Sequence, residues 1–256
     1  MCLILFSYLN HPDYKLILAS NRDEFYERPT RPLDFWGADK KVLAGKDERS
    51  LGTWLGVTTH GKIAAITNYR DPASVKDVAP SRGLLVSRYL ESDKKPGDYL
   101  EGLRSDSLAY NGFNLLAGDT NSLYYFSNRR PYIESIKPGI HGLSNAFLDT
   151  PWPKVETGKN NLDRILKRQR TIDIEDLFDL LADDHHPCDH DLPDTGIGLA
   201  WERMLSPVFI KSEIYGTRAS SIILIDNHDR MTFIERSFNL SASGESRIET
   251  RRFFQG

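Results

Sequence analysis

Short apolar runs separated by polar turn residues dominate the first third of the chain. Residues 2–9 (CLILFSYL) and 14–20 (YKLILAS) flank the turn-type cluster NHPD, and this pattern predicts a β-hairpin. Residues 53–59 and 62–68 flank a His-Gly pair and predict a second hairpin. Between the two hairpins, residues 21–52 are rich in Pro, Gly and charge. They predict a long structured connection, of the kind that often carries function.

The rest of the chain alternates between blocks of helical and strand-like pattern. Apolar residues at helical spacing predict helices at 79–92, 96–106, 151–169 and 173–184. Short β-rich runs predict strands at 112–119, 122–128, 139–145, 219–226, 230–238 and 247–254. The order lacks the regular strand–helix–strand alternation of a parallel sheet. We therefore expect an α+β fold, with two antiparallel sheets sandwiched between helical layers, as a single domain over residues 1–256.

Composition excludes several classes of protein. The 256 residues include 33 Lys and Arg against 36 Asp and Glu, so no basic excess points to nucleic acid or an anionic membrane surface. No run approaches the roughly 18–20 apolar residues of a membrane span, and the apolar start lacks the basic region of a signal peptide. Two Cys residues make no disulfide framework. We expect a cytoplasmic protein without an integral membrane span.

Cys2 is the first candidate for chemistry, and two interpretations of it stay open. It is a small apolar residue that starts a buried strand, or it becomes the chain terminus once Met1 is removed. In the second case one residue carries a thiol with a pKa of about 8.5 and an α-amine with a pKa of about 7.7–8.0. The amine is then able to take the thiol proton, directly or through a water molecule.

The triplet Asn21-Arg22-Asp23 follows the second strand of the first hairpin. A hairpin returns the end of its second strand to the start of its first, so this triplet is expected close to Cys2. Asp23 would favour the charged amine, and Arg22 would favour the thiolate. The alternative is a charged surface turn in which Arg22 pairs with Glu24.

Three further polar residues lie at strand ends. Asn68 and Asn145 each end a strand-like run, where Asn side chains or backbone N–H groups can form an oxyanion hole worth about 3–4 kcal/mol in acyl transfer. Asn also supplies turn geometry in most proteins, so this alternative stays open. Arg218 precedes an apolar strand and either aims a cation at the site or lies on the surface.

The segment DDHHPCDHD offers a second kind of site. His185, His186, Cys188 and His190 are soft ligand candidates among hard aspartates. Their spacing matches no standard zinc pattern, so a solvated loop is favoured over metal or haem binding. The chain carries no Gly-rich phosphate loop and no G-x-S-x-G elbow, and GTWLG is interpreted as architecture. We expect no metal and no cofactor.

Several segments together resemble a known family. MCLILFSYL, LILASNRDEFYERPT, GTWLGVTTHGKIAAITNYRDP, HGLSNAFLDTPWPKV and YGTRASSIILID are similar to the NRDE-motif family, which includes the transport and Golgi organisation type 2 proteins. The match covers nearly the whole chain. It implies a four-layer αββα fold like that of the N-terminal nucleophile hydrolases. Members of the family have been connected with lipid, acyl-CoA and haem handling.

The resemblance also implies roles for individual residues. Cys2 becomes the nucleophile and its amine the base once an aminopeptidase removes Met1, and Asp23 holds the amine. Asn145 resembles the oxyanion Asn, Asn68 or Tyr69 the second oxyanion position, and Arg218 the late Arg that supports the thiolate. Asn21 and Tyr69 are expected to contact the substrate, and Arg22 lies inside the triplet rather than ahead of it.

Three functions are therefore weighed. The first is an amidohydrolase that acts on a small acyl amide or a related acyl compound. The second is a non-catalytic carrier of acyl-CoA, lipid or haem on the same fold, and retention of Met1 would favour it. The third is a structural partner that binds no small ligand.

Overall fold

The computed structural model describes residues 2–168, 171–240 and 246–255. The chain forms two compact units, and neither is continuous in sequence. Unit 1 consists of Met1–Glu27, Lys137–Ser144 and Leu148–Gly256, and unit 2 consists of Arg28–Ile136 and Asn145–Phe147. The single domain expected over residues 1–256 stays a prediction.

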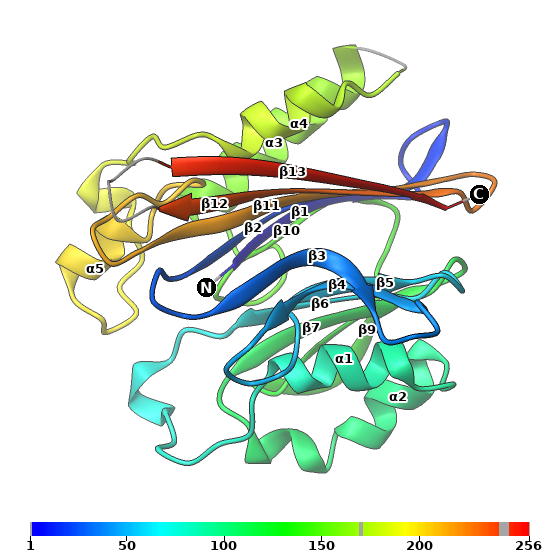
Figure 1. Ribbon diagram of the computed structural model, residues 1–256. Coiled ribbons are helices and arrows are strands. Elements are labelled where there is room, and N and C mark those ends of the chain that lie inside the picture. Colours follow the sequence, from blue (N-terminus) through cyan, green and yellow to red (C-terminus); the bar gives the residue numbers. More distant parts are fainter. Residues whose placement is uncertain (1, 169–170, 241–245, 256) are drawn as a thin grey trace. The chain divides into compact units, whose positions relative to one another are not determined.

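Unit 1 is built on a six-stranded antiparallel sheet with the strand order β10-β1-β2-β11-β12-β13 (Figure 1). Its strands are β1 (Cys2–Tyr8), β2 (Tyr14–Phe25), β10 (Gly139–Leu143), β11 (Tyr215–Asp226), β12 (Met231–Leu240) and β13 (Ser246–Gln255). Its helices are α3 (Pro153–Arg168), α4 (Ile174–Leu181) and α5 (Leu199–Met204).

The core of unit 1 lies between this sheet and helices α3 and α4, which run along one face of it in Figure 1. Successive side chains of a strand point to opposite faces. Leu3 and Leu5 of β1 therefore point to the same face, where they pack into one cluster with Val155 of α3 and Leu177 of α4. All seven residues of β1 are buried, so the strand is apolar on both faces rather than alternating.

Unit 2 is built on a seven-stranded antiparallel sheet in which the strands follow their chain order from β3 to β9 (Figure 1). Its strands are β3 (Thr30–Trp36), β4 (Val42–Asp47), β5 (Leu55–Thr58), β6 (Ile63–Asn68), β7 (Phe113–Gly118), β8 (Leu123–Ser127) and β9 (Arg130–Ser135). Helices α1 (Gly83–Glu91) and α2 (Pro96–Leu103) lie along one face of this sheet.

These elements confirm the expected α+β class with two antiparallel sheets. Each unit supplies one sheet and one layer of helices, which are the components of the predicted sandwich. The two predicted hairpins are present as β1–β2 and β5–β6. No helix among the described residues combines the length and the apolar composition that a membrane span requires.

The prediction for residues 21–52 is wrong in one respect. The segment is not a connection, because it contains the end of β2 and the whole of β3 and β4. Pro32 and the charged residues hide β3 in the sequence, and β3 tolerates them because it is an edge strand with a register shift between Arg31 and Asp34. The other edge strand, β9, was missed for a similar reason, because most of its residues are exposed and show no apolar alternation.

Two glycines of GTWLG bring the sheet of unit 2 close to α1. A Cβ added to Gly52 would lie 2.4 Å from the carbonyl carbon of Gly83, the first residue of α1. A Cβ added to Gly56 would lie 2.7 Å from Leu90 Cδ1 in the same helix. Real Cβ atoms essentially never show contacts under 3.0 Å. These glycines therefore have an architectural function, as the sequence indicated.

We expect Gly52→Ala to destabilise the protein by about 1–3 kcal/mol, because the added methyl group meets backbone atoms that cannot rotate away. The measurement is urea denaturation followed by far-ultraviolet circular dichroism. Gly97→Ala in α2 is the matched control, since the nearest atom to its added Cβ is 3.9 Å away. Ala also has the higher helix propensity, so no loss is expected there. Equal losses in both variants would contradict the close-approach argument.

Candidate active site

The pairing of β1 with β2 places the candidate nucleophile. Cys2 lies opposite Arg22, and Leu3 lies opposite Asn21. Because side chains alternate along each strand, Cys2 and Arg22 share one face of the sheet, and Leu3 and Asn21 share the other. The strands are antiparallel, so the backbone nitrogen of Cys2 lies at the end of β1 next to the Asp23 position. The loss of Met1 stays a prediction, because Met1 lies outside the described residues.

Asp23 is a buried carboxylate held by β11. The Thr217 hydroxyl donates to its Oδ1 at 2.7 Å, and the Tyr215 hydroxyl donates to its backbone oxygen at 2.9 Å. Burial raises the pKa of the Asp23 carboxyl, whereas the charge of Lys154 and the Thr217 hydrogen bond act in the opposite direction. Asp23 is therefore a buried acid whose charge depends on specific neighbours.

Lys154 is the most important residue that sequence reasoning missed. It lies in the first turn of α3, its side chain is only 5% exposed, and its Nζ donates to the Leu205 oxygen at 2.9 Å. A buried lysine needs compensation, and a nearby carboxylate supplies it. Lys154 stands in the PWPK segment at the start of a predicted helix. Nothing in this local pattern shows that the lysine side chain points into unit 1.

The environment of the Cys2 thiol favours its protonated form. Cys2 is 8% exposed, and burial raises its pKa. The negative charge of Asp23 raises it further, and the positive charge of Arg22 lowers it. Arg22 is itself buried, at 5% exposure, on the same face as the thiol. The thiol is thus not activated by its surroundings alone, and a proton acceptor is needed for it to act as a nucleophile.

Arg218 lies at an irregularity of β11, where the register with β2 shifts between Thr217 and Ala219. Its Nη1 donates to the backbone oxygens of Phe25 and Tyr26, each at 3.0 Å. Burial lowers the pKa of the Arg218 guanidinium, and the nearby charge of Arg22 adds to this effect. Arg218 therefore fastens the end of β2, and its support of a thiolate stays a prediction.

Asn21 points to the helix-covered side of the sheet. It is fully buried, and its Nδ2 donates to the oxygens of Leu181 and Val208 at 2.8 and 2.9 Å. Its Oδ1 accepts from the Ser220 hydroxyl at 2.6 Å. These bonds tie β2 to the end of α4 and to β11. Substrate contact by Asn21 stays a prediction, and its position opposite to the Cys2 face does not support it.

Unit 2 brings the remaining predicted residues together. Asn145 is 1% exposed, and its Nδ2 donates to the Asn68 oxygen at 2.9 Å. The Asn145 oxygen accepts from the Arg70 nitrogen at 2.7 Å. The Tyr69 ring lies 4.8 Å from the Phe147 ring between centroids. The two asparagines predicted for the oxyanion thus touch each other at the end of β6, and their role stays a prediction.

Asn114 is a second residue that the sequence did not reveal. It is fully buried in β7, and its Nδ2 donates to the Ala146 oxygen at 2.8 Å and to the Thr67 hydroxyl at 3.1 Å. The Tyr125 hydroxyl donates to its Oδ1 at 2.8 Å. Asn114 therefore holds the segment next to Asn145 against β6 and β7. A polar residue within an otherwise apolar strand is the sequence signal that would have identified it.

The histidine-rich segment lies on the surface of unit 1. Arg203 Nε donates to Asp189 Oδ1 at 2.7 Å, and His186 Nδ1 lies 3.1 Å from the Arg203 oxygen. The candidate ligand atoms of Cys188, His190 and Asp191 lie within 4.8 Å of one another, and all three residues are exposed. His185 and His186 do not belong to this group. The segment is mostly exposed, Asp189–Asp191 form one turn of 3-10 helix, and Arg203 anchors it. The preference for a solvated loop over metal or haem binding stays a prediction.

Known proteins resemble this chain in both sequence and fold. The family model described as Transport and Golgi organisation 2 matches residues 1–240. The chain belongs to this family. A mouse (Mus musculus) Transport and Golgi organization 2 homolog is 37% identical, over 99% of this chain and 98% of that relative. The resemblance inferred from NRDEF and its neighbouring segments is confirmed.

Solved structures extend the comparison of this Transport and Golgi organisation 2 family member to its fold. An N-acylethanolamine-hydrolyzing acid amidase ortholog from Caenorhabditis elegans has a TM-score of 0.52 and 9% identity, over 87% of this chain and 92% of that chain. A mutant conjugated bile acid hydrolase from Clostridium perfringens has a TM-score of 0.50 and 10% identity, over 98% and 97%. At such low identity the likeness shows the fold alone.

The electrostatics of Cys2 predict the pH dependence of its alkylation. In a Cys188→Ala background, we expect the rate of reaction with iodoacetamide to rise with a midpoint above the pKa of about 8.5 of a free thiol. Arg22→Gln should move the midpoint higher, because a charge that lowers the thiol pKa is lost. Asp23→Asn should move it lower, for the opposite reason. A midpoint at or below that of a free thiol would contradict the burial argument.

The interaction of Lys154 with the Asp23 carboxylate predicts that Lys154→Met lowers the free energy of unfolding by an amount that depends on pH. Without this lysine, the folded-state pKa of Asp23 rises further above its unfolded value of about 3.9, so the folded state prefers the protonated acid. The loss of unfolding free energy should be about 3 kcal/mol near pH 7 and smaller near pH 4, as measured by urea denaturation. Lys167→Met, at the exposed end of α3, should cost less than about 0.5 kcal/mol. A loss that does not depend on pH would show that Lys154 acts by packing alone.

Proposed function

We propose that the protein is an N-terminal-cysteine amidohydrolase that acts on a small acyl amide. The observation that carries the proposal is the pairing of Cys2 with Arg22, which places a thiol, a cation and the Asp23 carboxylate at one end of the β1–β2 hairpin. The two amide-hydrolysing proteins named above support it, because they share the fold over most of the chain.

The proposed reaction begins once Met1 has been removed. The α-amine of Cys2 accepts the proton of its own thiol, and the sulfur attacks the amide carbonyl carbon. The C–S bond forms, the carbonyl π electrons move to oxygen, and the C–N bond then breaks. The leaving nitrogen takes the proton from the α-ammonium. Water attacks the resulting thioester, releases the carboxylic acid and returns a proton to the sulfur.

The proposal gives each neighbouring group one task. Asp23 stabilises the ammonium that forms on Cys2, and Arg22 stabilises the thiolate. Arg218 adds positive charge while it fastens the end of β2. The proposal retains Asn145 and Asn68 as oxyanion donors.

The substrate class rests on the names of the structural neighbours. One of them is named for hydrolysing N-acylethanolamines, in which an acyl chain is joined to a small amine. The other is named for conjugated bile acids. Both names support an apolar acyl group as the part of the substrate to vary in a search for activity.

The test is turnover of fluorogenic acyl amides with acyl chains of increasing length. The protein is purified without an N-terminal tag, and its intact mass is measured first to verify that Met1 is absent. We expect Cys2→Ala to lower kcat by about 10³-fold or more, because the attacking atom is lost. Acid quenching during turnover should trap the acyl group on Cys2 of the wild-type protein.

Cys188→Ala is the matched control, because Cys188 is the second cysteine of the chain and lies on the surface. It should retain full turnover. Hydrolysis that survives in Cys2→Ala would overturn the proposal, and so would a processed wild-type protein that hydrolyses none of the amides.

A carrier of acyl-CoA, lipid or haem is the second candidate. The observation that favours it is the burial of the Cys2 thiol, which raises its pKa and opposes nucleophilic attack. A member of the acyl series that binds wild type and Cys2→Ala equally, and is turned over by neither, would assign the protein to this class.

A further inference from the structure

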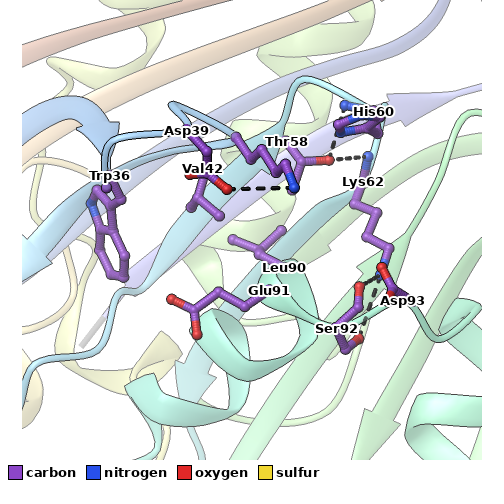
Figure 2. Close-up of a pocket in the computed structure, with 12 residues that line it drawn as sticks. Trp36, Asp39, Val42, Thr58, His60, Lys62, Leu90, Glu91, Ser92 and Asp93 are labelled. Carbon is purple, nitrogen blue, oxygen red and sulfur yellow. Dashed lines mark hydrogen bonds and ion pairs between the residues drawn. The ribbon is translucent and has the colours of Figure 1, made fainter.

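Unit 2 contains a cavity that the proposed hydrolase chemistry does not use. Its volume is about 590 Å³, within the range of about 300–1,000 Å³ typical of small-molecule sites. All of its lining residues belong to unit 2. They come from the end of β3 and the turn that follows it, from β4 and β5, from the turn between β5 and β6, and from the C-terminal end of α1 with the two residues after it (Figure 2).

One side of the cavity is apolar and aromatic. Val42 and Leu90 line the cavity and are buried, at 5% and 4% exposure, and Figure 2 shows both near Glu91. Trp36 Nε1 donates to the Ala44 oxygen at 3.0 Å, which fixes the orientation of the indole ring. The Lys46 ammonium lies 5.1 Å from the centroid of this ring. The ring therefore already attracts one ammonium group of the protein itself.

The C-terminal end of α1 attracts a second ammonium group. Lys62 Nζ donates to the Tyr89 oxygen at 3.3 Å and also to the Ser92 oxygen, and it lies 4.7 Å from the centroid of the Tyr89 ring. Unpaired carbonyl groups and the helix dipole give this end of a helix a partial negative charge. The charge of Lys62 is consumed here, as Figure 2 shows by its bonds to Ser92.

The charges that remain favour a cation. Lys41 lies 3.5 Å from Asp39 and compensates that carboxylate. No hydrogen bond or ion pair joins Glu91 to another residue in the described part of the chain, and its carboxylate extends toward the Trp36 side of the cavity in Figure 2. Because Lys46 already lies near the Trp36 ring and Lys62 already binds the end of α1, the Glu91 carboxylate is the group that supplies attraction to a cationic ligand. An anionic ligand would be repelled by this carboxylate.

We propose that this cavity binds a small organic cation, in which an amine or ammonium group is carried on an apolar body. The cationic group lies between Glu91 and Trp36, and the apolar body covers Val42 and Leu90. The site is additional to the proposed hydrolase chemistry and does not depend on it.

Three probes of the same length test the charge requirement. Hexylammonium, hexanol and hexanoate are titrated into the full-length protein, and binding is followed by amide chemical shifts. We expect hexylammonium to bind with a Kd of about 1 mM. Hexanol should bind about tenfold more weakly, and hexanoate should shift no cavity resonance. Hexanol binding as tightly as hexylammonium would overturn the proposal.

Variants locate the cationic group. Glu91→Gln should weaken hexylammonium binding about 3–5-fold and leave hexanol unchanged, because it removes a charge while retaining the side-chain shape. Trp36→Leu should weaken it by a similar factor. Glu134→Gln on the exposed strand β9 is the matched control and should have no effect, since it removes the same charge outside the cavity. Equal weakening by Glu91→Gln and Glu134→Gln would show only a general charge effect and would overturn the assignment.

A protein lysine is the competing occupant. A short lysine-containing peptide is therefore titrated in parallel with hexylammonium. Tighter binding of the peptide would assign the cavity to a protein partner and would overturn the small-molecule proposal. Weaker binding of the peptide supports it, because a peptide backbone fits the apolar wall less well than an alkyl chain does.

Discussion

The antiparallel pairing of β1 with β2 is the constraint on which the candidate site depends. Its register places Cys2 opposite Arg22, and the alternation of side chains then assigns every neighbouring residue to a face. If β1 were shifted by one residue along β2, the thiol would turn toward α3 and α4. Leu3 and Leu5 would then point away from the helices and leave the apolar cluster. The apolar packing that stabilises unit 1 therefore also fixes the position of the candidate nucleophile.

This arrangement places several charges where water is largely excluded. Asp23, Arg22 and Lys154 are all buried within unit 1, and burial of a charge is unfavourable unless a partner compensates it. The Thr217 hydroxyl and the charge of Lys154 stabilise the Asp23 carboxylate, and Arg22 favours the thiolate form of Cys2. Such a cluster contributes little net stability, but it tunes the proton affinity of the groups at the end of the hairpin.

Sharing a fold with known hydrolases does not establish that this protein shares their chemistry. Likeness to two amide hydrolases at 9% and 10% identity establishes the architecture, and architecture alone does not fix an activity. The contacts within each unit are more informative. The Asn145–Asn68 pair and its support from Asn114 show how unit 2 orders its predicted polar residues. The cavity lined by Glu91 and Trp36 is a separate feature of the same unit.

The sequence by itself determined the two hairpins, the α+β class and the closeness of Cys2 to Arg22, because these follow from local periodicity and short turns. It also carried the family motif. It did not determine the edge strands β3 and β9, whose residues form regular backbone pairs only because a neighbouring strand is present. Nor did it reveal that Asn21 turns away from Cys2, that Lys154 is buried near Asp23, or that Glu91 borders a cavity. Those features arise from contacts between segments far apart in the chain, and only the tertiary structure brings such segments together.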